Sequence, residues 1–303
     1  MAQLASLAPG ECSRQLADQG LRLKLGPFVA RVRTPLPDVA TSVERLYAAH
    51  ELADTADFID FDVAVRRVPG PRRWWQPQVA FHFDGDSPFN PLPGDQGFPV
   101  LEWGLNWCVY ALCHQYLNLH AAVLERAGRA LILPAPSGSG KSTLCAGLAL
   151  RGWRLLSDEL ALISPADGRV SAMPRPVSLK NQSIDVIQAF EPTLSFGSRV
   201  RETSKGEVAH FAPPTDAVRR AAESALPGWI VFPTYVAEKP ATLQPLDKSL
   251  AFMRLVENAF NYDVYGVEGF ELLGSVIDRS SCFSFEYGHL EEAVQVFDRL
   301  SAG

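Results

Sequence analysis

The first 87 residues alternate between apolar and polar side chains in short stretches that turn-forming residues separate. Residues 21–33 alternate on both sides of a Gly-Pro pair, which predicts a β-hairpin. Apolar side chains at helical spacing in 38–49 predict a short amphipathic helix. The stretches 58–67 and 74–85 alternate again and predict further strands. We therefore expect residues 1–87 to form a small α+β module.

A segment dense in proline and glycine follows, over residues 88–100. Proline fixes φ and removes a backbone donor, so this segment is not expected to hold a helix or a central strand. We interpret it as a linker, and we place a second domain at residues 101–303.

The second part of the chain has the pattern of strands and helices that is typical of an α/β domain. Residues 101–118 are apolar around most of a helical circumference, which predicts a buried helix. Residues 119–136 predict two strands joined by an Ala-Gly turn, and residues 141–152 predict a helix that ends at a glycine. Residues 153–164 are typical of a strand, and residues 289–303 predict an amphipathic helix.

Composition and charge exclude several classes of protein. The chain has 303 residues, which favours about two domains, and a formal net charge of −6 that argues against nucleic-acid binding. No apolar run approaches the ~18 residues of a membrane span, and the first residues lack a signal-peptide pattern. The five cysteines show neither disulfide nor metal-binding spacing. We therefore expect a cytoplasmic protein without nucleic-acid or membrane partners, and a homo-oligomer is compatible with the sequence.

The stretch Ala135-Pro-Ser-Gly-Ser-Gly-Lys-Ser142 lies between a predicted strand and a predicted helix, which is the context of a phosphate-binding P-loop. Its glycines let backbone N–H groups turn toward phosphate oxygens, and the helix N-terminus adds a positive dipole. The lysine is expected to reach the β- and γ-phosphates, and the following serine to bind Mg²⁺. The motif begins with Ala135 rather than glycine, and the alternative is a turn without a ligand. The residues expected to bind ATP are Ser137, Gly138, Ser139, Gly140, Lys141, Ser142 and Thr143.

Two acidic residues and one histidine are candidates for chemistry near this loop. Asp158 and Glu159 follow an apolar run, 17 and 18 residues after Lys141, so their strand is predicted to return beside the loop. A P-loop kinase uses one carboxylate for Mg²⁺ and often another for the attacking hydroxyl, whereas the alternative here is a solvated strand end. His120 lies on the strand predicted before the loop, where a histidine more often has a structural role in the core.

The joint spacing of these residues resembles the catalytic domain of bacterial HPr kinase/phosphorylase. The matching stretch is LHAAVLERAGRALILPAPSGSGKSTLCAGLALRGWRLLSDE, in which His120 precedes Lys141 by 21 residues, as in that family. Asp158-Glu159 stands where the family has two aspartates. Over most of the chain the sequence also resembles the group called HprK-related kinase A, through the segments LEWGLNW, LHAAV, GWRLLSDE, PRPVSLKN, ETSKGEVAHFAPP and NAFNY.

The resemblance implies a P-loop kinase domain of the HPr kinase/phosphorylase type, with ATP and Mg²⁺ as cofactors. Lys141 would hold the nucleotide, and Asp158 would be the general base for the substrate hydroxyl. Mg²⁺ would bind to Ser142, Asp158 and Glu159, and His120 matches the active-site histidine of the family. In that family the base can also return a proton to a serine phosphate, which gives phosphorylase activity.

Two further polar segments are candidates for contacts with phosphate or substrate. Arg175 and Lys180 lie among prolines and are predicted to clamp a transferring phosphoryl group. Thr203, Lys205 and His210 belong to a polar stretch with a glycine, which is predicted to close over the nucleotide or the substrate. The alternative for both segments is an ordinary surface loop.

The sequence therefore predicts an α/β protein with a small N-terminal α+β module that transfers the γ-phosphoryl group of ATP to a hydroxyl. The acceptor is a serine of a peptide or protein, or a small-molecule alcohol. The alternatives are a non-catalytic ATP-binding regulatory module and a bifunctional kinase/phosphorylase. The presence of both acids with the histidine favours chemistry, because binding alone requires only the loop.

Overall fold

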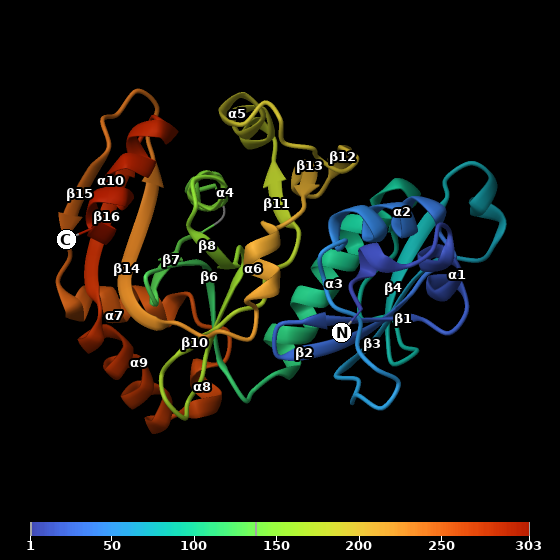
Figure 1. The fold of residues 1–303 in the computed structure, drawn as a ribbon, viewed down its shortest axis with the longest axis horizontal. Helices are drawn as coiled ribbons and strands as arrows, with labels where there is room; N and C mark the ends of the chain where they lie inside the picture. The colour runs from blue at the N-terminus through green and yellow to red at the C-terminus, as the bar shows by residue number, and fades with distance from the viewer. Residues whose placement is uncertain (1, 137, 303) are drawn as a thin grey trace.

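The computed structural model describes residues 2–136 and 138–302, which form a mixed α/β fold with an N-terminal and a C-terminal half (Figure 1). The sheet of the N-terminal half has the order β1-β2-β3-β4-β5; β2 and β3 are parallel, and the other neighbours are antiparallel. Its strands are β1 (Leu21–Leu25), β2 (Phe28–Arg33), β3 (Phe61–Arg67), β4 (Gln78–Phe83) and β5 (Leu92–Pro93). The helices before and between them are η1 (Leu4–Ser6), α1 (Glu11–Ala17), α2 (Pro37–Leu46), η2 (Pro71–Trp74) and η3 (Gly94–Gln96).

The predicted α+β elements of the N-terminal half are confirmed. Strands β1 and β2 alternate buried and half-buried residues and form a hairpin whose turn includes Gly26, with a φ of 61°. Helix α2 buries the apolar face expected from its spacing, including Val39, Val43 and Leu46. Strands β3 and β4 pair with each other within the two stretches that were predicted to alternate.

The segment 88–100 differs from the expected linker without helix or strand. It contains β5, η3 and the first residues of α3 (Gly97–Leu112), so this expectation is wrong. Pro99 is compatible with the helix because it lies in the first turn, where backbone N–H groups have no intrahelical partner. Helix α3 therefore begins four residues before the helix that was predicted from residue 101.

Helix α3 packs against β3 and β4 and shares a hydrophobic core with the N-terminal sheet. Gly104 permits this close approach, because a Cβ there would lie 2.1 Å from the ring of Phe81 on β4. Although the sequence assigned it to the second domain, α3 belongs to the N-terminal core. The division of the chain into independent domains stays a prediction.

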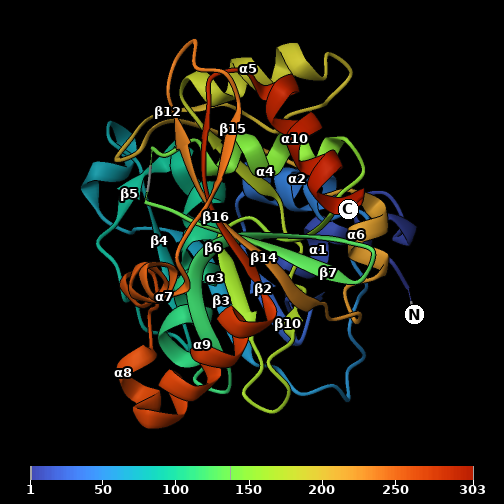
Figure 2. The ribbon, with the colours of Figure 1, turned by 90° about the vertical axis from the view of Figure 1, so that its left-hand side faces the viewer.

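The C-terminal half is built on a sheet with the order β10-β9-β6-β7-β14-β16-β15, in which β8 also pairs with β6. Strands β7, β14 and β16 are parallel, and helices pack on both faces, α4 and α10 on one and α7 and α9 on the other (Figure 2). The strands are β6 (Leu117–Arg126), β7 (Arg129–Pro134), β8 (Arg154–Ser157), β9 (Leu160–Ile163), β10 (Val170–Ser171), β14 (Leu226–Tyr235), β15 (Thr242–Pro245) and β16 (Ser281–Tyr287). The helices are α4 (Lys141–Leu150), α7 (Lys248–Glu257), α8 (Tyr262–Tyr265), α9 (Val267–Arg279) and α10 (Leu290–Ala302).

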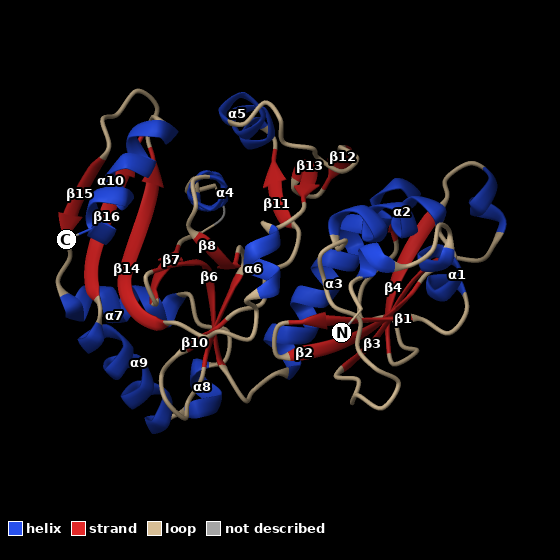
Figure 3. Ribbon diagram, viewed as in Figure 1, coloured by secondary structure: helices blue, strands red, loops and turns tan. Residues whose placement is uncertain are grey.

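A small third sheet lies between α4 and the N-terminal half (Figure 3). Its strands are β11 (Val177–Lys180), β12 (Val200–Thr203) and β13 (Gly206–Phe211), in the order β11-β13-β12. Helix α5 (Gln182–Phe190) follows β11 and contacts α4, and α6 (Thr215–Arg219) follows β13. None of these elements was predicted from the sequence pattern.

The strand pair and the helices that were predicted around the glycine-rich loop are confirmed. Strands β6 and β7 are joined by Ala127 and Gly128, both with positive φ. The strand expected in 153–164 is instead two strands, β8 and β9, and the break between them falls at Asp158 and Glu159. In the described part of the chain, no helix is long and apolar enough to cross a membrane.

We expect Gly104→Ala to lower the free energy of unfolding by about 1–3 kcal/mol, because the added methyl group would overpack α3 against β4. Chemical denaturation measures this change. The matched control is Gly274→Ala in α9, where a Cβ would meet nothing within 4 Å. The control should leave stability unchanged or raise it by up to ~1 kcal/mol, since alanine favours a helix. Equal effects of the two substitutions would contradict the packing of α3.

Candidate active site

A glycine-bearing loop connects β7 to α4 and forms one wall of the candidate site. Gly138 and Gly140 have φ values of 89° and 87°, in the left-handed region that favours glycine. A Cβ at position 140 would lie 2.5 Å from the hydroxyl oxygen of Tyr287 and 2.8 Å from Cβ of Tyr235, so the site has no room for a larger residue. Ser137, which was also predicted to bind the nucleotide, lies outside the described residues.

Two neighbouring strands hold this loop in place. The Tyr287 hydroxyl donates a hydrogen bond of 2.8 Å to the Gly140 carbonyl, and the Tyr235 N–H donates one of 2.9 Å to the Ser139 carbonyl. Tyr235 ends β14 and Tyr287 ends β16, the strands that continue the parallel order from β7. The loop therefore lies at the carboxyl edge of parallel strands, where open α/β sheets commonly bind ligands.

The loop borders a cavity of about 550 Å³, a volume within the range of small-molecule binding sites. The side chains from other elements that line this cavity include four that were predicted from the sequence: His120, Glu159, Lys180 and Lys205. The structure thus brings together most of the residues that were predicted from the sequence. The predicted nucleotide-binding residues in the lining are Gly138, Ser139, Gly140, Lys141, Ser142 and Thr143.

Lys141 is a buried cation at the first position of α4. The residue is only 5% exposed, and its Nζ has no hydrogen-bond partner among the described residues. Burial lowers the pKa of this ammonium group, and the carboxylates of Glu159 and Asp158 only partly oppose that shift. A buried charge without hydrogen bonds is unfavourable unless an anion accompanies it. An anion in the cavity would therefore stabilise the charged form of Lys141.

Asp158 and Glu159 lie between β8 and β9, where the strand that runs along β6 is interrupted. Glu159 lines the large cavity, and it also borders a second cavity of about 10 Å³ behind it. Asp158 is 4% exposed and borders the small cavity; its Oδ2 accepts a 2.9 Å hydrogen bond from the Ser178 N–H. Glu159 therefore borders both cavities, whereas Asp158 borders the small cavity.

The environments of the two acids move their pKa values in opposite directions. Burial, followed by the neighbouring charge of Glu159, raises the pKa of Asp158 to about 7. Burial also disfavours ionisation of Glu159, but the His120 side chain and the charges of Lys141 and Lys180 outweigh it and lower the pKa of Glu159. Glu159 is thus an anion at neutral pH, whereas Asp158 can take up and release a proton there.

His120 is positioned by a segment that is distant in sequence. Its Nε2 lies 3.4 Å from Oε2 of Glu159, on the side of the large cavity. The His120 N–H donates a 2.7 Å hydrogen bond to the Asn258 carbonyl, and the ring lies 5.9 Å from the ring of Phe260. The stretch NAFNY, which begins at Asn258, therefore extends the edge of β6 and supports the histidine.

Lys180 and Lys205 reach the large cavity from the small third sheet. Asn181 joins their two segments, because its side chain accepts a 3.0 Å hydrogen bond from the Glu207 N–H and donates one of 3.4 Å to the Lys205 carbonyl. Asn181 has a positive φ of 51°, so this junction is conformationally constrained. The Lys205 ammonium lies 5.1 Å from the ring of Trp103 on α3, in cation–π contact.

Three other predicted contact residues lie outside the lining of the large cavity. Thr203 Oγ1 donates a 2.6 Å hydrogen bond to the Gly206 carbonyl and holds the turn between β12 and β13. Arg175 and His210 border the small cavity together with Asp158. Burial, followed by the charge of Arg175, lowers the pKa of His210 to about 3, so its ring is neutral at pH 7. The predicted clamp of Arg175 and Lys180 is thus divided between two cavities.

Three residues that were not predicted from the sequence hold the loop and the third sheet in place: Tyr235, Tyr287 and Asn181. Tyr235 and Tyr287 are far from the loop in sequence, and no local pattern marks their contacts with it. Asn181 ends the stretch PRPVSLKN, which was singled out for its cations rather than for this amide. Among the described residues, no group of three or more His, Cys, Asp and Glu side chains could hold a metal ion.

Comparison with known proteins gives limited matches. The family model described as "SynChlorMet cassette protein ScmC" matches residues 102–190, a segment that contains the loop, α4 and both acids. The matching family is thus not the HprK-related group that the sequence resembles. No curated protein matches the chain. Among solved structures, the Hpr(Ser) kinase/phosphatase from Coxiella burnetii is similar at 12% identity and a TM-score of 0.27, over 61% of this chain and 97% of that chain.

Proposed function

We propose that the protein is a kinase that transfers the γ-phosphoryl group of ATP to a hydroxyl group. The observation that carries this proposal is the buried, unpartnered ammonium of Lys141 at the N-terminus of α4. Lysine, glycine loop and helix N-terminus together favour the phosphates of a nucleotide. The adjacent acids and histidine supply groups that binding alone would not need.

The residues of the large cavity also fit Mg²⁺. Ser142 and the ionised Glu159 both line it, and Mg²⁺ typically takes one or two protein oxygens together with phosphate oxygens and water. A cluster of three protein ligands is therefore not required. When bound, Mg²⁺ would neutralise charge on the phosphates during transfer. We assign Ser142 and Glu159 as the residues that would hold it.

We assign proton acceptance to Asp158 because its pKa lies near 7, which suits a general base at neutral pH. Glu159, which stays ionised, would orient the cation rather than take up a proton. His120 would keep Glu159 in place from the β6 side. Lys180 and Lys205, which line the cavity from the third sheet, would approach the phosphates or the acceptor. The acceptor is a serine of a peptide or protein, or a small-molecule alcohol.

Lys141→Ala should abolish detectable Mg-ATP binding and turnover, because the charge that meets the phosphates is removed. Calorimetry and ATP consumption measure the two effects. Lys248→Ala is the control, since Lys248 pairs with Asp278 on the outer helices. Unchanged affinity and turnover in folded Lys141→Ala would show that the nucleotide does not bind at this loop.

Asp158→Asn should lower turnover by about 10²–10⁴-fold while the affinity for ATP stays within a few-fold, because the amide cannot accept the proton. In the unsubstituted protein, turnover should rise with pH through about 7, as Asp158 loses its proton. This pH-dependent limb should be missing in Asp158→Asn. The assay follows ATP turnover between pH 5.5 and 8.5 in the presence of cell extract as a source of acceptor.

Glu159→Gln distinguishes the role of Glu159 from that of Asp158. It should raise the Mg²⁺ concentration needed for half-maximal turnover, whereas Asp158→Asn should not. The reverse result would exchange the two assignments. If both variants bound ATP and turned over near the rate of the unsubstituted protein, the acids would be structural and the chain a nucleotide-binding module.

A further inference from the structure

The segment 172–178 leads from the end of β10 into the first residues of β11. Ser178, the second residue of β11, donates the 2.9 Å hydrogen bond to Asp158 Oδ2, so the position of this segment affects the orientation of the carboxylate. The segment belongs to the C-terminal half. Within that half the Met173 N–H donates to the Leu156 carbonyl and β11 pairs with β13, but three separate elements of the N-terminal half contact the segment as well.

Two of these contacts are made at Ala172 and Pro174. The turn between β1 and β2 approaches so closely that a Cβ at Gly26 would lie 2.0 Å from the Ala172 carbonyl oxygen. His50, which follows α2, has its Nε2 2.9 Å from the Pro174 carbonyl oxygen. Burial lowers the pKa of His50 to about 4, so the neutral ring donates this hydrogen bond at pH 7.

The third contact is a buried ion pair at Arg175. Its guanidinium lies 3.4 Å from Oε2 of Glu102 and also donates to the side chain of Asn106, both on α3. The Tyr47 hydroxyl donates a 2.5 Å hydrogen bond to the other carboxylate oxygen of Glu102. The side chains of Arg175 and Glu102 are 3% and 5% exposed, and both border the small cavity that contains Asp158.

We propose that Glu102 is a positioning residue for Asp158, and that the N-terminal half is thereby part of the active unit. Glu102 holds Arg175, Arg175 fixes the backbone that continues to Ser178, and Ser178 orients the carboxylate. Helix α3, to which Glu102 belongs, lies on the side of the N-terminal half that faces the rest of the molecule (Figure 1). This inference rests on the proposed function, because it assumes that Asp158 acts in the transfer step.

Loss of the Glu102 charge should displace the segment. A buried guanidinium without its carboxylate is strongly unfavourable, so Arg175 would shift toward the remaining acids or toward water. Either movement pulls on Pro176 and Val177 and weakens the hydrogen bond to Asp158. Small misplacements of a catalytic group can lower a rate up to about 100-fold without changing the binding of the substrate.

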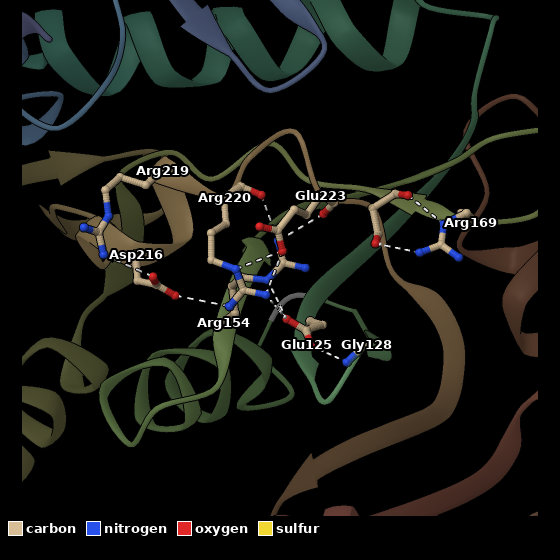
Figure 4. Close-up of polar contacts among 9 residues, drawn as sticks. Glu125, Gly128, Arg154, Arg169, Asp216, Arg219, Arg220 and Glu223 are labelled. Atoms are coloured by element: carbon tan, nitrogen blue, oxygen red, sulfur yellow. Dashed lines mark hydrogen bonds and ion pairs between the residues drawn. The ribbon is translucent and has the colours of Figure 1, made fainter.

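A second buried ion pair provides a matched control (Figure 4). Arg154 Nε lies 2.5 Å from Glu125 Oε2, and both side chains are 4% exposed. Glu125 also accepts a hydrogen bond from the Gly128 N–H, at the hairpin end of β6. Glu125→Gln therefore removes a buried carboxylate of the same kind, paired with the same kind of residue, away from the segment behind Asp158.

The experiment compares Glu102→Gln with Glu125→Gln by amide hydrogen exchange and by kinetics. We expect Glu102→Gln to speed exchange of the Ser178 amide by about tenfold or more and to lower kcat by about 10–100-fold, with the Kd for Mg-ATP within twofold. Glu125→Gln should lower the melting temperature similarly but leave exchange at Ser178 and kcat unchanged. Tyr47→Phe removes only one hydrogen bond to Glu102, so it should also speed exchange at Ser178 and lower kcat, but less than Glu102→Gln does. It is the test variant if Glu102→Gln does not fold.

Equal behaviour of the Glu102 and Glu125 variants in exchange and kcat would overturn the inference. Faster exchange at Ser178 with an unchanged kcat would overturn it as well. The proposed function is judged separately, by turnover of the unsubstituted protein and its loss in Asp158→Asn. If the unsubstituted protein consumes no ATP, the proposed function fails, while hydrogen exchange still shows whether Glu102 holds the segment.

Discussion

The arrangement of the candidate site depends on one buried positive charge, the ammonium of Lys141. The loop that precedes α4 and Lys141 lies at the carboxyl ends of the parallel strands β7, β14 and β16. Terminal residues of the neighbouring strands hold this loop in place. Its Nζ has no hydrogen-bond partner in the described part of the chain, and the residue is only 5% exposed. Under the function that we propose, a phosphate group in the cavity would accept hydrogen bonds from this ammonium group.

The acids next to this charge show how environment separates two similar groups. His120 and the nearby lysines lower the pKa of Glu159 and keep it ionised, whereas burial raises the pKa of Asp158 to about 7. The break between β8 and β9 falls at these two residues, and Glu159 reaches the large cavity while both acids border the small one. A network from the N-terminal half reaches Asp158 through Arg175, so the two halves of the chain contribute to one site.

Local sequence patterns predicted the parts of the molecule that local forces determine. The β1–β2 hairpin, α2, the β6–β7 pair and the loop before α4 all follow from alternation, helical spacing or glycine placement. The start of α3 was missed because proline density outweighed the fact that Pro99 falls in a first turn. The contacts of Tyr287 with Gly140 and of Glu102 with Arg175 join residues far apart in the chain, and no local pattern encodes them.

The most direct measurement is a crystal structure of the full chain with Mg²⁺ and a non-hydrolysable ATP analogue. We expect the phosphates of the analogue on the loop before α4, within hydrogen-bond distance of Lys141 Nζ. We also expect Ser142 and Glu159, but not Asp158, among the ligands of the metal. An analogue bound elsewhere, or a Lys141 ammonium that remains without a phosphate contact, would contradict the account.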